Sequence, residues 1–358
     1  MGVYFGDLLD ELPDVMGAQT REIRWASPYA VLTDYGYLNV VDCSDPSSLV
    51  ARGREALLPD ELQAAILVDP PLIYLGLQSW PLYFDIWDMT DPDNLSLRDR
   101  VTISSAYTSF MSDLAKSGNY VYISGNKYDS RYEHITIMNV TDPDNIVEES
   151  EFDGGANLAN TPTGLAVDAT GDYLFVSCRA LFTVLDISTR NAPAYSNKIA
   201  ITDTALGPGR IRLTSDGYAY VSRISPDAID IIDVRDPTSV SLVATLTDLN
   251  FLNWPRSIQI IGDLLYSFNY LAHPGDGKYY VSVWDITTRA APTWLESICM
   301  DDIGLWRVGA FVIDPDTDTL YVGKRTTSTA KSFASIGTAA AAGGGGNQAG
   351  ALVKAAFI

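Results

Sequence analysis

The stretch NVVDCSDP at residues 39–46 recurs along the chain as DIWDMTDP (85–92), TIMNVTDP (136–143), TVLDISTR (183–190), DIIDVRDP (230–237) and SVWDITTR (282–289). The six copies align without gaps on one acidic or amide residue, called the anchor below: Asp42, Asp88, Asn139, Asp186, Asp233 and Asp285. Successive anchors are 46, 51, 47, 47 and 52 residues apart. A period near fifty residues without a helical pattern inside it is typical of propeller blades.

The residues around each anchor predict a strand that is buried on both faces. The position two before the anchor is β-branched in all six copies, which suits a packed strand. The positions directly before and after the anchor are also apolar. Successive strand residues point to opposite faces of a sheet, so this strand must be covered on both sides. Blades stacked against their neighbours in a ring provide that cover.

The turn after this strand is equally regular. Four copies continue with Asp-Pro, which suits the first two positions of a type I turn, and the other two reach a proline seven residues after the anchor. The pairs Asp42/Asp45, Asp88/Asp91 and Asp233/Asp236 would be possible cation ligands. Because the pattern repeats in nearly every unit, local hydrogen bonds that brace the turn are the favoured interpretation. We therefore predict that the anchors are structural.

The remaining strands of each unit are recognisable upstream and downstream of the anchor. Tyr120–Ser124 and Tyr173–Ser177 illustrate the preceding strand, and Ser241–Thr245 the following one. A seventh unit begins near Val308 and lacks the anchor motif. We predict an all-β propeller of seven four-stranded blades at residues 26–337. Residues 1–25 form an N-terminal segment that is expected to complete the last blade unless the C-terminus does so, and 338–358 form an Ala/Gly-rich arm.

The phrase YAVLTDYGYLNVVDCSDPSSLV (29–50) resembles an LVIVD-type repeat, and the resemblance extends over about residues 26–300. It implies a seven-bladed propeller, usually extracellular or attached to a surface. It brings no shared catalytic residues. The chain lacks the Gly-His signature of WD40 blades, so Trp87-Asp88 and Trp284-Asp285 belong to the local repeat motif.

Composition limits the classes of partner. The net charge of −21 disfavours binding to nucleic acid, whereas a basic protein surface remains compatible with it. No stretch is apolar enough for a membrane span, and residues 1–17 do not resemble a signal peptide. Synthesis in the cytoplasm is therefore expected, with incorporation into a virion as one destination. Cys43, Cys178 and Cys299 are scattered and are expected to be buried thiols.

No catalytic, cofactor or metal site is predicted from the sequence. Its two histidines, His134 and His273, belong to no GxSxG or HExxH motif, and the second is expected in a plain loop. The acidic clusters Asp227/Asp230, Asp301/Asp302 and Asp314/Asp316/Asp318 are expected to be solvated turns. Gly343–Gly346 lacks the features of a phosphate loop and is expected to be a linker.

Two classes of function follow. The favoured hypothesis is a non-enzymatic interaction or assembly module, either a virion component of phage or archaeal-virus type or an LVIVD-like surface or extracellular binding protein. Its partner would be another protein or a neighbouring subunit, and the C-terminal arm is one candidate for the segment that binds it. The alternative is a propeller hydrolase or lyase with a metal at the central channel, whose ligands come from different blades.

Overall fold

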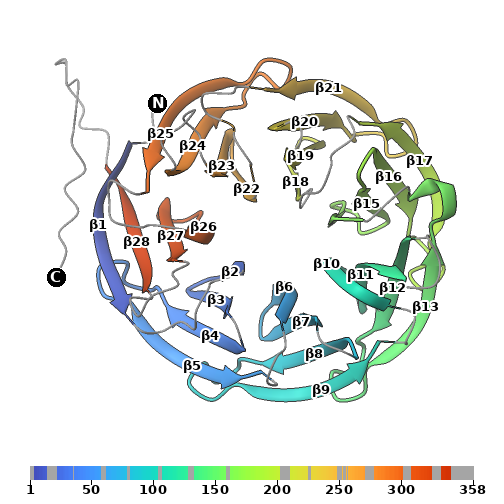
Figure 1. Cartoon of the computed structure of the whole chain (residues 1–358), viewed down its shortest axis with the longest axis horizontal. Helices are drawn as coiled ribbons and strands as arrows, with labels where there is room; N and C mark the ends of the chain where they lie inside the picture. The colour runs from blue at the N-terminus through green and yellow to red at the C-terminus, as the bar shows by residue number, and fades with distance from the viewer. Residues whose placement is uncertain are drawn as a thin grey trace.

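A computed structural model describes residues 4–13, 22–34, 36–57, 62–78, 81–103, 107–127, 133–158, 162–201, 210–224, 227–247, 252, 255, 257–270, 278–300, 308–324 and 332–339. These residues form seven antiparallel sheets of four strands each. The sheets are arranged radially around a central axis, as Figure 1 shows. The predicted seven-bladed β-propeller is confirmed.

The blades follow one another along the chain. The first three contain β2 (Glu22–Ala26), β3 (Tyr29–Asp34), β4 (Tyr37–Asp42), β5 (Val50–Ala56); β6 (Leu62–Asp69), β7 (Leu72–Gln78), β8 (Tyr83–Asp88), β9 (Ser96–Thr102); and β10 (Tyr107–Ser117), β11 (Tyr120–Lys127), β12 (Glu133–Asn139), β13 (Val147–Asp153). The next three contain β14 (Gly164–Val167), β15 (Tyr173–Ser177), β16 (Leu181–Asp186), β17 (Ala194–Ala200); β18 (Ile211–Leu213), β19 (Tyr218–Ile224), β20 (Asp227–Asp233), β21 (Ser241–Leu246); and β22 (Ser257–Ile261), β23 (Leu264–Tyr270), β24 (Tyr279–Asp285), β25 (Thr293–Cys299). A single 3-10 turn, η1 (Gly155–Asn157), follows β13.

The seventh blade is built from both ends of the chain. Its sheet has the order β1-β28-β27-β26, with β26 (Val308–Asp314), β27 (Thr319–Lys324), β28 (Ser332–Ala339) and β1 (Tyr4–Pro13). Strand β1 is antiparallel to β28, with Tyr4 opposite Ala339 and Pro13 opposite Ser332. The outermost strand of this blade therefore comes from the N-terminal segment, and it lies beside β28 on the outside of the ring in Figure 1.

The strand that ends at each anchor is the third from the axis in all six repeats, as predicted (β4, β8, β12, β16, β20 and β24). In five of the six repeats the second strand places an aromatic residue opposite the β-branched position two before the anchor: Tyr74 faces Ile86, and Tyr266 faces Val283. Tyr122, Phe175 and Tyr220 occupy the same position in their blades and are fully buried. Large aromatic side chains at this position fill the space between neighbouring blades.

The apolar core is divided into seven clusters, one between each pair of neighbouring blades. The cluster between the seventh and first blades joins Val312 and Tyr321 to Ile23 and Leu32. Tyr321 also stacks on Trp25, with 5.2 Å between the ring centroids. Burial of both faces of every blade explains why the third strands show no alternation of apolar and polar residues on either side of the anchor.

One buried column is polar, and the sequence pattern around the anchor does not reveal its burial. The residue three before the anchor is almost completely inaccessible in all six repeats: Asn39, Asp85, Thr136, Thr183, Asp230 and Ser282. Several have partners within the blade. Asp85 binds the Arg100 guanidinium through both oxygens, at 2.7 and 2.6 Å. A polar group buried in this way is costly unless it has a partner, and the Asn39 amide has none among the described residues.

Candidate functional site

The anchors brace the turn at the end of each third strand. In every repeat the anchor side-chain oxygen accepts a hydrogen bond from the backbone N–H two residues later, at 2.7–3.1 Å. The backbone N–H directly after the anchor then donates to a carbonyl in the turn between the first two strands of the same blade, at 2.7–3.0 Å. The two turns at this end of the blade are thus tied together by hydrogen bonds at and next to the anchor.

In the first three repeats the anchor has a side-chain partner ten residues later, and the type of partner changes with the anchor. Arg52 binds Asp42 and Arg98 binds Asp88, each at 2.8 Å. In the third repeat the anchor is Asn139, and its amide donates to Glu149 at 2.8 Å. An amide needs an acceptor where a carboxylate needs a donor, so the exchange preserves the contact.

These hydrogen bonds also affect the acidity of the anchors. The pKa is lowered for Asp88, Asp186, Asp233 and Asp285, and the first cause in each is a side-chain hydrogen bond from the residue two positions later. The second aspartates of the repeated pairs act in the same local way: Asp45, Asp91, Asp142 and Asp236 each accept the backbone N–H two residues later. The described contacts of both sets are those of turns.

Replacing Asp233 with alanine is therefore expected to lower the free energy of unfolding by about 1–3 kcal/mol, because the turn loses its acceptor for the Arg235 N–H. Asp233→Asn is the matched control. It keeps an acceptor oxygen, as Asn139 does in the third repeat, and should cost less than about 1 kcal/mol. Denaturant unfolding measures both, and equal losses in the two variants would contradict the turn-bracing role.

The structure places the other predicted site residues as follows. The interpretation of Asp227/Asp230 as a solvated turn is wrong, because both lie on β20 and Asp230 is buried against Arg223. Asp314 accepts the Asp316 N–H in the turn after β26 but is itself buried. His134 is buried on β12, with its Nδ1 4.0 Å from a Glu151 oxygen.

Other predictions fall partly or wholly outside the described residues: His273, Asp301/Asp302, Gly343–Gly346 and all of the arm beyond Ala339. Of the cysteines, Cys43 and Cys178 are buried as expected, whereas Cys299 is only half-buried. The described residues contain no group of three or more His, Cys, Asp or Glu side chains arranged to hold a metal ion.

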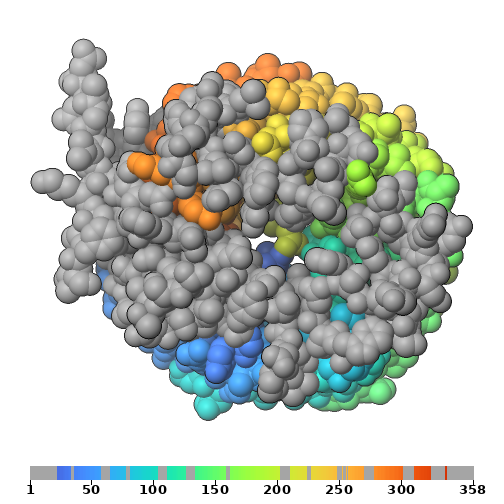
Figure 2. Space-filling model, in the orientation of Figure 1, coloured from blue at the N-terminus to red at the C-terminus, as the bar shows by residue number. Residues whose placement is uncertain are grey.

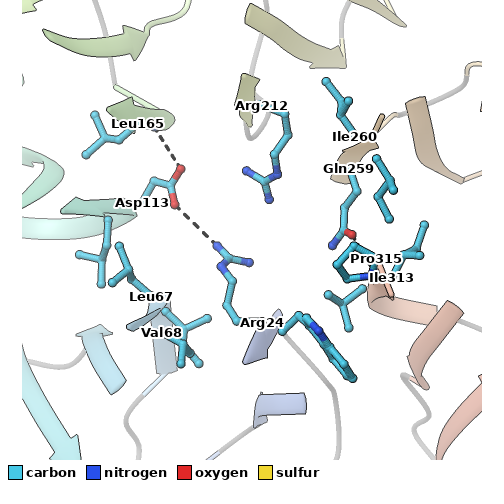
Figure 3. A pocket seen from close by; sticks show the side chains of 15 residues that line it. Arg24, Leu67, Val68, Asp113, Leu165, Arg212, Gln259, Ile260, Ile313 and Pro315 are labelled. Carbon is cyan, nitrogen blue, oxygen red and sulfur yellow. Dashed lines mark hydrogen bonds and ion pairs between the residues drawn. The ribbon is translucent and has the colours of Figure 1, made fainter. Parts of the chain in front are cut away.

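A cavity of about 390 Å³ lies at the centre of the ring, and Figure 2 shows the hollow there. All seven innermost strands contribute to its lining, which is mainly aliphatic. Three charged side chains interrupt the apolar wall: Arg24 from β2, Asp113 from β10 and Arg212 from β18. Figure 3 shows them converging from three different blades. Gln259 also lines the cavity, but its amide is engaged with the backbone of Phe311 and Ile313.

An ion-pair network extends from the cavity wall. Asp113 binds Arg210 at 2.7 Å, lies 3.9 Å from Arg24 and accepts the Leu165 N–H at 3.1 Å. Glu22 pairs with Arg24 at 3.1 Å and also with Arg210. Burial raises the pKa of Asp113, and the nearby Arg24 charge opposes that shift. Burial lowers the pKa of Arg210 to about 9 and that of Arg212 to about 10, so both guanidinium groups remain charged at neutral pH.

The sequence contains a signal for this network that the repeat pattern does not use. Glu22-Ile23-Arg24 and Arg210-Ile211-Arg212 both place charged residues on either side of one buried isoleucine. Residues two apart on a strand point to the same face, so each tripeptide directs two charges together. The second charged residue of each tripeptide, Arg24 or Arg212, lines the cavity.

The comparisons support the fold and the repeat. LVIVD repeats match residues 21–54, 165–200 and 213–248, which correspond to the first, fourth and fifth blades. The predicted resemblance is thereby confirmed: the protein is a seven-bladed β-propeller that carries LVIVD repeats. No curated protein matches the chain significantly in sequence.

Solved structures share the architecture at low identity. A protein from Lactobacillus plantarum superposes with a TM-score of 0.62 at 14% identity, covering 79% of this chain and 86% of that one. A candidate 6-phosphogluconolactonase from Bacteroides uniformis gives 0.63 at 12%, covering 80% and 84%. A functionally unknown protein from Desulfotomaculum acetoxidans gives 0.61 at 12%, covering 82% and 95%. These similarities concern the fold alone.

No helix in the described part of the chain has the length and apolar character needed to cross a membrane.

Proposed function

We propose that the protein is a non-enzymatic interaction module that binds partner proteins through the outer edge of its blades. The observation that carries this proposal is a regular set of exposed apolar residues, called the rim residues: Val50, Leu97, Val147, Tyr195, Leu242 and Trp294. They are the large hydrophobic side chains that are exposed among the described residues, each with 40–47% of its surface accessible.

The rim residues occupy one place in the repeat. Each lies at the beginning of an outermost strand, eight or nine residues after an anchor. Leu97 and Trp294, for example, lie opposite Trp87 and Trp284, the residues directly before their anchors. Single exposed apolar residues are ordinary on protein surfaces. Their recurrence in six blades around the same edge is what favours a docking surface.

Charge indicates which partner would suit this edge. With a net charge of −21, copies of the chain repel one another at low salt. A partner that combines apolar contacts with a basic surface would be attracted by the same field. A virion component or a surface-displayed binding protein are two settings for such a module. The virion proposal rests on the composition of residues 338–358, most of which lie outside the described residues.

The cavity lining gives less support to a metal-dependent hydrolase or lyase. Asp113 is the one carboxylate in the described lining, and it is already bound by Arg210. Arg24 and Arg212 would repel a divalent cation placed beside it. Hard cations are usually bound by several oxygen ligands, which this wall does not provide.

A variant in which Leu97, Tyr195, Leu242 and Trp294 are replaced with serine should lose its partner while remaining folded, since all four side chains are exposed. The matched control changes the exposed residue before each one to asparagine (Ser96, Ala194, Ser241 and Thr293). Cross-linking and quantitative affinity purification from the source cells should recover the same protein with the wild type and the control. Recovery should fall at least about tenfold with the rim variant, as expected when interface hot spots are removed.

The proposal fails if no protein is recovered reproducibly with the wild type, or if the rim variant recovers it equally well. Size-exclusion chromatography with light scattering, performed on all three proteins, shows whether the rim variant is a folded monomer.

A further inference from the structure

The charged groups around the central cavity do not balance. Three guanidinium groups, those of Arg24, Arg210 and Arg212, face two carboxylates, those of Glu22 and Asp113. Both carboxylates are engaged by Arg24 and Arg210. One positive charge is left over at the centre of a protein whose net charge is −21.

That remaining charge belongs to Arg212. Within the described residues its guanidinium forms no ion pair within 4.0 Å and donates one hydrogen bond, from Nη1 to the Ile211 carbonyl at 2.8 Å; the Asp113 charge attracts it from farther away. Figure 3 shows the side chain extending from β18 into the cavity. A guanidinium has five N–H donors, and the half-buried Arg212 uses one of them within the described residues, which leaves the others for a ligand in the cavity.

The chemistry of the arginines indicates the kind of ligand. A guanidinium is a hydrogen-bond donor only and carries a positive charge. Arg212 and Arg24, which both line the cavity, therefore favour a ligand that brings acceptor oxygens and negative charge.

We propose that the central cavity is a binding site for a small anion that carries a carboxylate or phosphate group, held by Arg212 with Arg24 beside it. A guanidinium can bind two oxygens of either group in parallel. The aliphatic wall formed by residues such as Leu67, Leu165 and Ile260 would pack against the rest of the molecule. The volume of about 390 Å³ limits the ligand to metabolite size.

This site is independent of the proposed rim interaction, because the rim residues lie on the outermost strands and the cavity is formed by the innermost ones. The acidic surface also helps the test. A protein with a net charge of −21 repels anions from its surface, so saturable anion binding must come from a local site.

Isothermal titration at constant ionic strength, with inorganic phosphate in one arm and succinate in the other, tests the proposal and distinguishes the two anion classes. Saturable binding of at least one probe to the wild type is expected. Arg212→Gln should weaken it by about tenfold or more, in line with the loss of a charge-assisted hydrogen-bonded pair. The matched control Arg54→Gln removes the same charge from an exposed residue on β5 and should bind as the wild type does.

Thermal unfolding of the same proteins without ligand separates binding from folding. Arg212 forms no ion pair within 4.0 Å with a described carboxylate and is attracted only from farther away by Asp113, so Arg212→Gln should change the Tm little. Added probe should raise the Tm of the wild type and the control but not of this variant. The proposal is overturned if neither probe binds the wild type at up to about 10 mM, or if Arg212→Gln binds with wild-type affinity.

Discussion

Replacing Arg223 with methionine should lower the free energy of unfolding by about 3–5 kcal/mol, the range found when one partner of a buried ion pair is removed. Arg223 on β19 lies opposite Ala228, and Asp230 on β20 lies opposite Val221, so the two charged side chains meet diagonally across the strands. Their side chains are 2% and 1% exposed. The Nε–Oδ2 distance is 2.7 Å, and a second bond from Nη2 measures 3.0 Å. Without the guanidinium, Asp230 would keep the Thr245 hydroxyl as a partner but would have no counter-charge.

Two further variants make this expectation specific. Arg235→Met, in the same blade, removes an arginine that pairs with Asp233 at the surface and should cost less than about 1 kcal/mol. The double variant Arg223→Met/Asp230→Leu removes both buried charges and should recover most of the stability lost by the single one. Denaturant unfolding followed by tryptophan fluorescence measures all three. If the free energy of unfolding of Arg223→Met lies within about 1 kcal/mol of the wild-type value, Asp230 is not left as a buried unpaired charge when Arg223 is removed.

The Arg223–Asp230 pair is also an example of a feature that the repeat pattern does not predict. The third strand and its turn were predictable because the same physical demand, a doubly buried strand followed by a braced turn, recurs six times with one spacing. Asp230 occupies a column in which the polar residues differ from blade to blade, from Asn39 to Ser282. Each has its own local environment, and a repeat alignment does not show that a polar residue is buried rather than solvated.

The cavity is harder still to predict from sequence. Arg24, Asp113 and Arg212 come from three blades and are separated by about ninety residues or more along the chain. They come together only because the innermost strands converge on the axis. Sequence motifs describe groups that lie close together on one loop or one strand. A site formed by residues from different blades therefore has no such motif, and only short patterns such as Arg210-Ile211-Arg212 indicate it in the sequence.

The seventh blade differs from the other six because its outermost strand lies far from the others in sequence. The third-strand position is filled by β28, and the fourth by β1. The missing anchor motif after Val308 shows that the last unit is incomplete as a repeat. Seven described residue pairs join β1 to β28, so this pairing connects the two ends of the propeller through backbone hydrogen bonds.

Deletion of residues 2–13 should therefore destabilise the whole propeller. It removes β1, and at about 1 kcal/mol for each backbone hydrogen bond the loss amounts to several kcal/mol, with a fall in Tm of several degrees or more. It also leaves β28 as an unpaired edge that can pair with another chain, so soluble oligomers or aggregates should appear.

Deletion of residues 345–358 is the matched control, because it shortens the other terminus by a similar length and leaves every described strand intact. Calorimetry and light scattering compare the two. If the chain without residues 2–13 stays monomeric with the Tm of the control, the pairing of β1 with β28 does not close the ring. If it unfolds or associates while the control does not, the N-terminal strand holds the first and last blades together.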